Sequence, residues 1–587
     1  MPPMQTEVAP IPRAHAPLFF GNGILSTVLT PSGTGYSLYR DVLLGAWQDD
    51  PCDDEYGLAI WVRDPEGGAF SAAGAPLAGD APRTLLAGAQ CASIASGGEG
   101  LAAEVTFSML AGAAQERREL VLTNLTDRAR VLEVTAVLEV VLNTAPAQEG
   151  HPAFSKLFVQ TAFRPEAKML VATRRPRGAG ETPPALGLAL EGSEVLSFET
   201  DRVRLVGRGR SLADPVALTA PLGDSLGNVL DPALALRTRI TLPARGRATL
   251  AFVLVAADDA AGLEAARLAR GEHVAPRPIA TAPPEVLTLA TATLGPAGGS
   301  ASRTRPQRFR HAGPGALPTG NGHGEFVDDG RVYRIAVGRA ADGTLRLPPM
   351  PWTNVIANES FGLIASEKGS LSTFCGNSRL HRLTPWRNDP VTDPHDEALY
   401  VRDEASGAWW SALPGPAPVA ATYEVRHGHG WSQWRHESMG LGHELTVYVP
   451  REDPVRLARL VLTNPGSTPR ALAVYSYARL VLGGTPAETM PRMRARGVRP
   501  LAHAAFSEAM IMAQAASLMP EELPAVTEPP SRKAAGSLDR VSIVVSPRGC
   551  SSASTMNSVL PFLALTATIS LVKKPRSMAA LQRRWLR

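Results

Sequence analysis

Cysteine is scarce in this sequence of 587 residues, and no two cysteines are closely spaced. The four cysteines are Cys52, Cys91, Cys375 and Cys550. Disulfide-rich domains and structural zinc sites need clustered cysteines, so neither class is expected. The sequence therefore predicts no metal ion and no cofactor.

Lysine and net charge are also low. Only six of the 59 basic residues are lysines, and the formal net charge is +4 with both signs interspersed. A nucleic-acid-binding protein would carry a concentrated basic surface, so no nucleic-acid partner is expected.

Long apolar runs are missing as well. The best membrane candidate, residues 559–572, is shorter than the roughly 20 residues of a membrane helix and contains Pro561. The N-terminus has no apolar segment of the kind found in secretory signals. We expect no direct membrane span and a cytoplasmic location.

The sequence does contain a long internal repeat. The string LVLTN occurs at 120–124 and again at 460–464, a spacing of 340 residues. At a spacing of 339, Trp47, Asp50 and Pro51 correspond to Trp386, Asp389 and Pro390. A repeat this long predicts two copies of a module, each large enough to hold its own core.

Both copies have the alternating pattern of half-buried strands. Apolar side chains alternate along 132–140 and again along 472–480, and Gly/Pro turns separate many short runs of this kind. This pattern predicts an all-β fold of large antiparallel sandwiches. One short helix is expected, at about 260–270.

Composition divides the chain into five segments. We expect a disordered N-terminus at 1–14, a first sandwich at 15–273 and a Pro/Gly-rich linker at 274–318. The second sandwich is expected at 319–485, followed by a tail at 486–587.

The tail differs from the rest of the chain. Seven of the thirteen methionines lie there, no tyrosine follows Tyr477, and strings expected from the repeat are not found. The interpretation is that the second copy is truncated and that the tail is irregular, disordered or the product of a frameshift.

Several longer strings carry a family resemblance. They include PWTNVIANESFGLIASEKGS (351–370), GNSRLHRLTPWRNDPVTDP (376–394), TPSGTGYSLYRD (30–41) and HPAFSKLFVQT (151–161). These strings resemble the N-terminal β-sandwich of glycoside hydrolase family 94, formerly glycosyltransferase family 36. Within that family they resemble the C-terminal region of the cyclic β-1,2-glucan synthases.

The resemblance implies two tandem β-supersandwiches of the galactose-mutarotase-like type. It also implies β-glucan or gluco-oligosaccharide as partner and glycosyl transfer or phosphorolysis as the family's activity. In the family, the acid that protonates the leaving oxygen belongs to a helical (α/α)6 barrel downstream of the sandwiches. No barrel is recognised in this sequence, so the resemblance implies a separate helical barrel as partner, and no catalytic residue is assigned.

The loop around Trp386 is the first choice for a carbohydrate site. An aromatic face and paired donors and acceptors suit sugar hydroxyls. The six candidate residues are Trp386, Arg387, Asn388, Asp389, Asn377 and Arg379. The alternative is structural: Trp386 anchors a turn and Asp389, before Pro390, caps it.

Two other patterns favour structural roles. Arg63-Asp64 and Arg402-Asp403 end a strand in each copy, where an ion pair or turn cap explains them. The four histidines His427, His429, His436 and His443 have few acidic neighbours in sequence, so a metal site is not predicted.

Three functions follow. The first is the carbohydrate-binding tandem sandwich portion of a cyclic β-1,2-glucan synthase-like protein that lacks its catalytic barrel. The second is an active β-glucoside phosphorylase or glycosidase that uses carboxylates such as Asp49, Asp50 and Asp389. The third is an inactive structural remnant of such an enzyme.

Overall fold

Antiparallel strands make up most of the regular structure, as the alternating patterns predict. The computed structural model describes residues 17–47, 55–77, 84–87, 91–98, 100–269, 321–485, 540–548 and 562–570. The predicted N-terminal segment 1–14, the linker 274–318, and Asp49 and Asp50 lie outside the described residues.

The chain divides into two compact units. Unit 1 comprises residues 1–288 together with 388–392, and unit 2 comprises residues 289–387 and 393–587. The short segment 388–392 thus belongs to unit 1, although its neighbours in sequence on both sides belong to unit 2.

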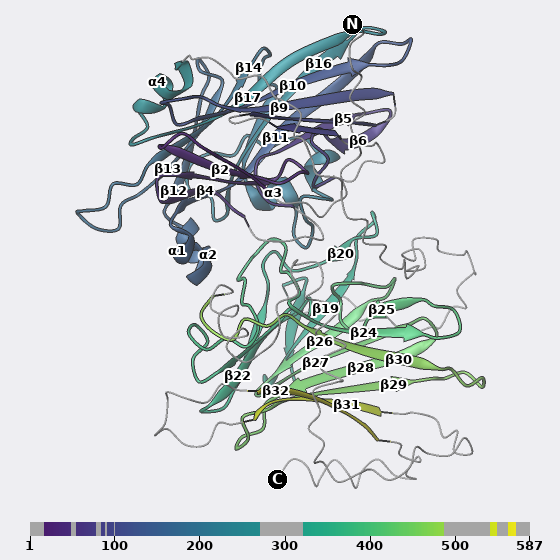
Figure 1. Cartoon of the computed structure of the whole chain (residues 1–587). Coiled ribbons are helices and arrows are strands. Elements are labelled where there is room, and N and C mark those ends of the chain that lie inside the picture. Colours follow the sequence, from purple (N-terminus) through teal and green to yellow (C-terminus); the bar gives the residue numbers. More distant parts are fainter. Residues whose placement is uncertain are drawn as a thin grey trace, which may run out of the picture. The chain divides into compact units, whose positions relative to one another are not determined.

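Unit 1 contains two large antiparallel sheets (Figure 1). The nine-stranded sheet contains β1 (Leu18–Gly21), β2 (Leu25–Leu29), β3 (Gly35–Tyr39), β4 (Val42–Gly45), β5 (Ala59–Asp64), β6 (Gly68–Ser71), β11 (Arg130–Asn143), β15 (Ser197–Asp201) and β16 (Pro232–Leu242). The eight-stranded sheet contains β7 (Thr84–Ala87), β8 (Cys91–Gly98), β9 (Leu101–Met109), β10 (Gln115–Asn124), β12 (Val159–Arg164), β13 (Met169–Arg174), β14 (Ala185–Glu191) and β17 (Arg247–Ala257).

The main core of unit 1 draws its side chains from both sheets. In β17, Leu250, Phe252 and Leu254 belong to this core, whereas Val253 and Val255 pack in a second cluster with Leu263. Successive side chains of a strand point to opposite faces, so one strand supplies both clusters. The arrangement is the sandwich that the sequence predicts.

Short helices cover parts of unit 1. Helix α4 (Gly262–Leu268) confirms the helix predicted at 260–270. Three further helices were not predicted: α1 (Ala145–Gly150), α2 (Pro152–Lys156) and α3 (Arg202–Val206). Each has five or six residues, too few to show a helical period in the sequence. No helix within the described ranges is long and apolar enough to cross a membrane.

Unit 2 has one large and two small antiparallel sheets (Figure 1). The large sheet contains β18 (Gly324–Val327), β19 (Val332–Arg339), β20 (Leu345–Arg346), β26 (Tyr423–Gly428), β27 (Trp431–Ser438), β28 (Leu441–Tyr448), β29 (Arg456–Thr463), β31 (Arg540–Arg548) and β32 (Phe562–Ser570). The small sheets contain β21 (Thr353–Ala357), β22 (Phe361–Ser366) and β23 (Leu371–Cys375), and β24 (Glu397–Asp403), β25 (Trp409–Ser411) and β30 (Leu472–Ala478).

The two units repeat the same strand pairing in the same register. Leu120 of β10 lies opposite Val105 of β9, and Leu460 of β29 lies opposite Leu445 of β28, 340 residues later. The pairing of β5 with β11 recurs likewise in the pairing of β24 with β30. The internal repeat of the sequence is therefore a repeat of structure.

The string LVLTN ends in an asparagine that closes the same loop in each unit. Asn124 Nδ2 donates to the carbonyl oxygen of Arg128 at 2.7 Å, and Asn464 Nδ2 donates to that of Thr468 at 2.8 Å. Each side-chain oxygen also accepts a backbone N–H two residues ahead. The asparagine at the end of both LVLTN strings is thus explained by the same turn, which it closes in each unit.

The Arg-Asp pairs that end β5 and β24 have the predicted structural role. Asp64 accepts the N–H of Glu66 and pairs with Arg130, with Nε to Oδ2 at 2.6 Å. Asp403 accepts the N–H groups of Ala405 and Ser406, and it pairs with Arg470 at 2.9 Å. Both aspartates cap a turn, which is one of the two predicted roles, whereas their pairing with Arg130 and Arg470 was not predicted.

Part of the predicted tail lies in the large sheet of unit 2. Strand β31 pairs with β29, with Val541 opposite Leu460, and β32 pairs with β31. In unit 1, β17 occupies the corresponding place beside β10, with Leu250 opposite Leu120. The other tail residues lie outside the described residues.

Candidate functional site

The six predicted carbohydrate-binding residues lie in both units. Asn377 and Arg379 are in an exposed turn of unit 2, in which Asn377 Oδ1 accepts the N–H groups of Arg379 and Leu380 at 2.9 Å each. Asn388 and Asp389 belong to unit 1. The predicted residues therefore divide between the two units.

In unit 2, Trp386 is half-buried and Arg387 makes a two-point ion pair. Arg387 Nε donates to Asp396 Oδ2 at 2.9 Å, and Nη2 donates to Oδ1 at 3.1 Å. The two guanidinium N–H groups of Arg387 that could bind paired sugar hydroxyls are thus already bonded to Asp396.

In unit 1, Asp389 caps a turn. Its Oδ1 accepts the backbone N–H groups of Val391 at 2.8 Å and Thr392 at 3.0 Å, and its Oδ2 accepts the Thr392 hydroxyl at 2.8 Å. Val391 is fully buried in an apolar cluster that includes Trp61, and its carbonyl oxygen accepts the N–H of Gly209. The segment 388–392 is thereby held in unit 1 by apolar and polar contacts.

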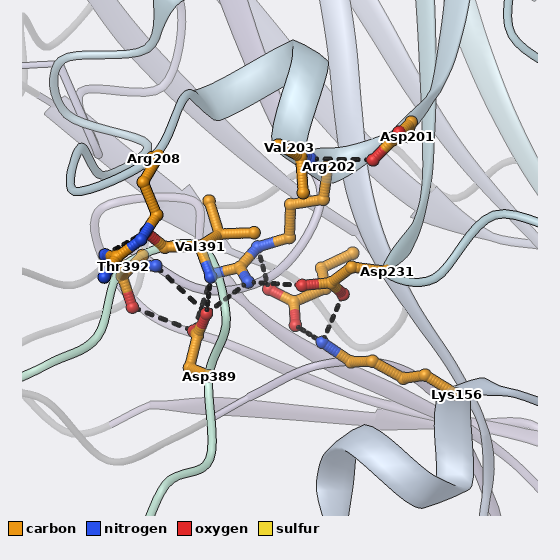
Figure 2. Close-up of polar contacts among 10 residues, drawn as sticks. Lys156, Asp201, Arg202, Val203, Arg208, Asp231, Asp389, Val391 and Thr392 are labelled. Carbon is orange, nitrogen blue, oxygen red and sulfur yellow. Dashed lines mark hydrogen bonds and ion pairs between the residues drawn. The ribbon is translucent and has the colours of Figure 1, made fainter. Parts of the chain in front are cut away.

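Asp389 also belongs to a buried cluster of five charged residues, of which Figure 2 labels Lys156, Arg202, Asp231 and Asp389. Arg202 donates to both carboxylate oxygens of Asp389 at 2.9 Å each. Arg202 also pairs with Asp231 and Glu139, and Lys156 pairs with the same two carboxylates. Two cations therefore face three carboxylates, and each charge has at least one partner of opposite sign.

Each member of the cluster is placed by a different element. Glu139 lies in β11, Lys156 ends α2, and Asp231 immediately precedes β16. Arg202 is the first residue of α3, where Asp201 accepts the N–H of Val203 as the N-cap. The cluster thus joins parts of the chain that are far apart in sequence.

The cluster favours the charged forms of Asp389 and Lys156. Burial alone would raise the pKa of Asp389, but Arg202, Lys156 and hydrogen bonds outweigh it and hold the pKa well below its usual range. Burial would lower the pKa of Lys156, but Asp231 and Glu139 hold it above its usual range. Asp389 is therefore an ionised structural carboxylate, whereas a general acid must carry a proton at working pH.

The histidines of β27 and β28, His436 and His443, pack against aromatic rings inside unit 2. The rings of His436 and His443 stack with centroids 4.2 Å apart, and Trp410 Nε1 donates to His443 Nε2 at 2.9 Å. Within the described ranges, no group of three or more His, Cys, Asp or Glu side chains could hold a metal ion.

A hollow at the surface of unit 1 was not predicted from the sequence. It lies beside the turn between β12 and β13 and the loop between β14 and β15, and it has a volume of about 280 Å³. Its residues come from three separate segments. The only signals in the sequence were two phenylalanines, Phe163 and Phe198, at the end of one strand and near the start of another.

Comparisons with known proteins give one family and several relatives. The profile described as "Glycosyl hydrolase 94, supersandwich domain" matches residues 4–270 and 341–505, more than half of the chain. Cyclic beta-(1,2)-glucan synthase NdvB of Rhizobium meliloti (strain 1021) is 25% identical, over 84% of this chain and 24% of that protein. N,N'-diacetylchitobiose phosphorylase of Vibrio furnissii is 29% identical, over 26% of this chain and 19% of that protein.

A solved structure is also similar. It is a galactose mutarotase related enzyme from Lactobacillus acidophilus, with 8% identity and a TM-score of 0.22, and the match covers 41% of this chain and 97% of that chain. This chain spans about a quarter of the length of the glucan synthase and less of the phosphorylase.

Proposed function

Because this chain belongs to the glycosyl hydrolase 94 supersandwich family, we propose that it binds β-glucan or gluco-oligosaccharide as the tandem sandwich portion of a cyclic β-1,2-glucan synthase-like protein. The observation that carries the proposal is the similarity to the glucan synthase, which extends over 84% of this chain and so includes both copies of the repeat. The family match, likewise, has one segment in each copy.

The parent activity is glycosyl transfer or phosphorolysis, and in this proposal its reacting groups lie on a separate helical barrel. An inverting phosphorylase needs a protonated carboxylic acid at the leaving oxygen. Of the three candidate catalytic carboxylates, Asp389 lies within the described residues, and it is ionised and paired with Arg202. This arrangement favours a binding role over catalysis by the chain alone.

The six loop residues remain proposed sugar contacts. Arg387 and Asp389 already hold ion pairs within the protein, whereas Arg379 has an exposed side chain in the turn closed by Asn377. We therefore expect Arg379→Ala to weaken sugar binding through a lost sugar contact. Changes at the paired residues Arg387 and Asp389 would first lower the stability of the protein.

Calorimetric titration of the full chain with β-1,2-linked gluco-oligosaccharides tests the proposal. Saturable heat is expected with these ligands, and no heat with a mannose oligomer of the same length. If no heat is measured at millimolar ligand, the binding proposal is wrong and the structural-remnant alternative is favoured.

A second candidate function is an active phosphorylase, favoured by the similarity to N,N'-diacetylchitobiose phosphorylase. It is tested by incubating the chain with β-1,2-glucan and inorganic phosphate. Release of glucose 1-phosphate above background, lost when Asp50 is changed to Asn, would establish catalysis by this chain.

A further inference from the structure

The surface hollow of unit 1 is formed by three segments of the chain. They are the end of β12 with the following turn, the loop leading into β15, and the loop before β16. The hollow has a volume of about 280 Å³, close to the lower limit of roughly 300 Å³ for small-molecule sites. Its lining consists of Phe163, Pro165, Lys168, Glu194, Val195, Leu196, Ser197, Phe198 and Asp224.

Two phenylalanine rings form an apolar wall of the hollow. The centroids of Phe163 and Phe198 lie 4.6 Å apart and the ring planes are 31° from parallel. Both rings are half-buried and pack against the main core of unit 1, while Leu196 beside them is 46% exposed. The two rings therefore cover part of each other, and the part of the pair that lines the hollow offers apolar contact to the C–H groups of a sugar ring.

The rim of the hollow is polar and carries more negative than positive charge. Lys168 Nζ donates to the carbonyl oxygen of Ser193 at 3.0 Å and pairs with Glu194. Asp224 Oδ1 accepts the N–H of Phe198 at 2.8 Å. Two carboxylates against one ammonium disfavour a phosphate or a carboxylate ligand, whereas they can accept hydrogen bonds from hydroxyl groups.

The segments around the hollow are fixed to the sheets behind them. The N–H of Leu196 donates to the carbonyl oxygen of Arg237 at 2.7 Å, and the hydroxyl groups of Ser193 and Thr238 lie 2.6 Å apart. The N–H of Gly223 donates to Glu199 at 3.1 Å. A site already held in its bound shape loses little conformational entropy when a ligand enters.

We propose that this hollow binds one neutral pyranose ring of a gluco-oligosaccharide, with C–H groups of the sugar packed against the Phe163–Phe198 pair and its hydroxyl groups hydrogen-bonded to the carboxylates of the rim. The ligand class rests on the function proposed above, and the position rests on the geometry of the hollow. The strings that build the hollow have no counterpart in the second copy of the repeat, so we expect one such site per chain.

Calorimetry with the full chain and a β-1,2-linked glucotriose tests the proposal. Phe163→Leu keeps an apolar side chain but removes the aromatic face, and we expect roughly fivefold weaker binding, the size of one aromatic contact. Leu196→Arg places a long charged chain at the mouth of the hollow, where the exposed position favours normal folding, and we expect binding in the hollow to be lost.

Leu230→Arg is the matched control, because Leu230 is a 62% exposed leucine of unit 1 outside the lining of the hollow. Its affinity for the glucotriose should equal that of the wild type. Melting temperatures of all variants identify any loss of fold, and Leu196→Arg keeps the test valid if Phe163→Leu is unstable.

The outcomes separate the two proposals. If the wild type binds the glucotriose and Phe163→Leu and Leu196→Arg bind equally well, the position is wrong and the proposed function stands. If the wild type does not bind, both proposals fail. Tighter binding of glucose 6-phosphate than of glucose at the same position would overturn the neutral ligand class.

Discussion

Asp389 has two roles at the scale of single residues, because it caps its own turn and neutralises Arg202. Asp389→Asn keeps the side-chain oxygen that accepts the N–H groups of Val391 and Thr392 but removes the charge opposite Arg202. Breaking a buried ion pair on one side costs about 3 kcal/mol. We expect unit 1 to lose roughly that amount of unfolding free energy, measured by urea titration with hydrogen exchange of unit 1 peptides.

Asp214→Asn is the matched control for this prediction. Asp214 also faces an arginine, Arg210 at 3.5 Å, but its side chain is 74% exposed. The change should leave the unfolding of unit 1 unaltered, since exposed ion pairs contribute little. Equal stability of Asp389→Asn and the wild type would show that the buried cluster does not hold segment 388–392.

The stability that ionised Asp389 contributes also depends on pH in a defined direction. Its folded-state pKa lies below the value of about 3.9 in an unfolded chain. The contribution is therefore fully present above about pH 5 and is lost as the pH falls below about 4. In Asp389→Asn, this part of the acid destabilisation of unit 1 should be absent.

The paired asparagines allow a comparison between the two units. Asn124 is 1% exposed and donates to two carbonyl oxygens, whereas Asn464 lies at the surface. A lost hydrogen bond costs more where its partners are buried. We expect Asn124→Ala to destabilise unit 1 by about 2 kcal/mol and Asn464→Ala to destabilise unit 2 by less than about 1 kcal/mol.

Asn228→Ala is the control for these two variants, because Asn228 is exposed and its side-chain oxygen accepts a hydrogen bond from Gln160 Nε2 at the surface, at 2.9 Å. Urea unfolding of the three variants gives the comparison. A larger loss for Asn464→Ala than for Asn124→Ala would contradict the explanation from burial.

At the scale of elements, strands β27 and β28 make unit 2 sensitive to acid. Burial lowers the pKa of His436 to about 2, with His443 adding to the effect, and burial lowers the pKa of His443 to about 4. An unfolded chain binds protons on these histidines below about pH 6.5, whereas the folded chain does not. The stability of unit 2 should therefore fall as the pH drops from about 6.5 to 4.

The acid sensitivity is checked by urea unfolding at several pH values with the variant His436→Phe. A phenyl ring can stack against His443 as the imidazole does, but it does not titrate. The decline in unit 2 stability between pH 6.5 and 4 should be shallower in this variant. An unchanged slope would show that His436 is not responsible.

Strand β31 protects an edge of the large sheet of unit 2. It pairs with β29 along Arg456–Val461, and the other partner of β29 among the described strands is β28. Deleting residues 540–587 leaves a row of unpaired backbone groups on β29, which favours pairing with another chain. We expect concentration-dependent association of the deletion variant by light scattering, and a monodisperse deletion variant would contradict this role.

The elements differ in how far the sequence predicts them. The alternation along 132–140 predicts a strand because one side chain in two enters the core, and β11 confirms it. Helix α2 is missed because five residues show no helical period. The turn role of Asp389 can be read from the following proline, but its pairing with Arg202, 187 residues earlier, depends on the tertiary fold.

At the scale of the whole molecule, one sandwich design occurs twice in one chain, with the same register and the same turn residues. The hollow with Phe163 and Phe198 belongs to unit 1 and has no sequence counterpart in the second copy. The two copies therefore share a scaffold, and the proposed sugar pocket belongs to unit 1.

Hydrogen–deuterium exchange of the full chain, with and without a saturating β-1,2-linked gluco-oligosaccharide, tests this account most directly. We predict slower exchange with the ligand in peptides covering 159–170, 192–200 and 219–228, the segments that surround the hollow. Exchange that is unchanged throughout the chain at millimolar ligand would contradict the claim that this protein binds β-glucan.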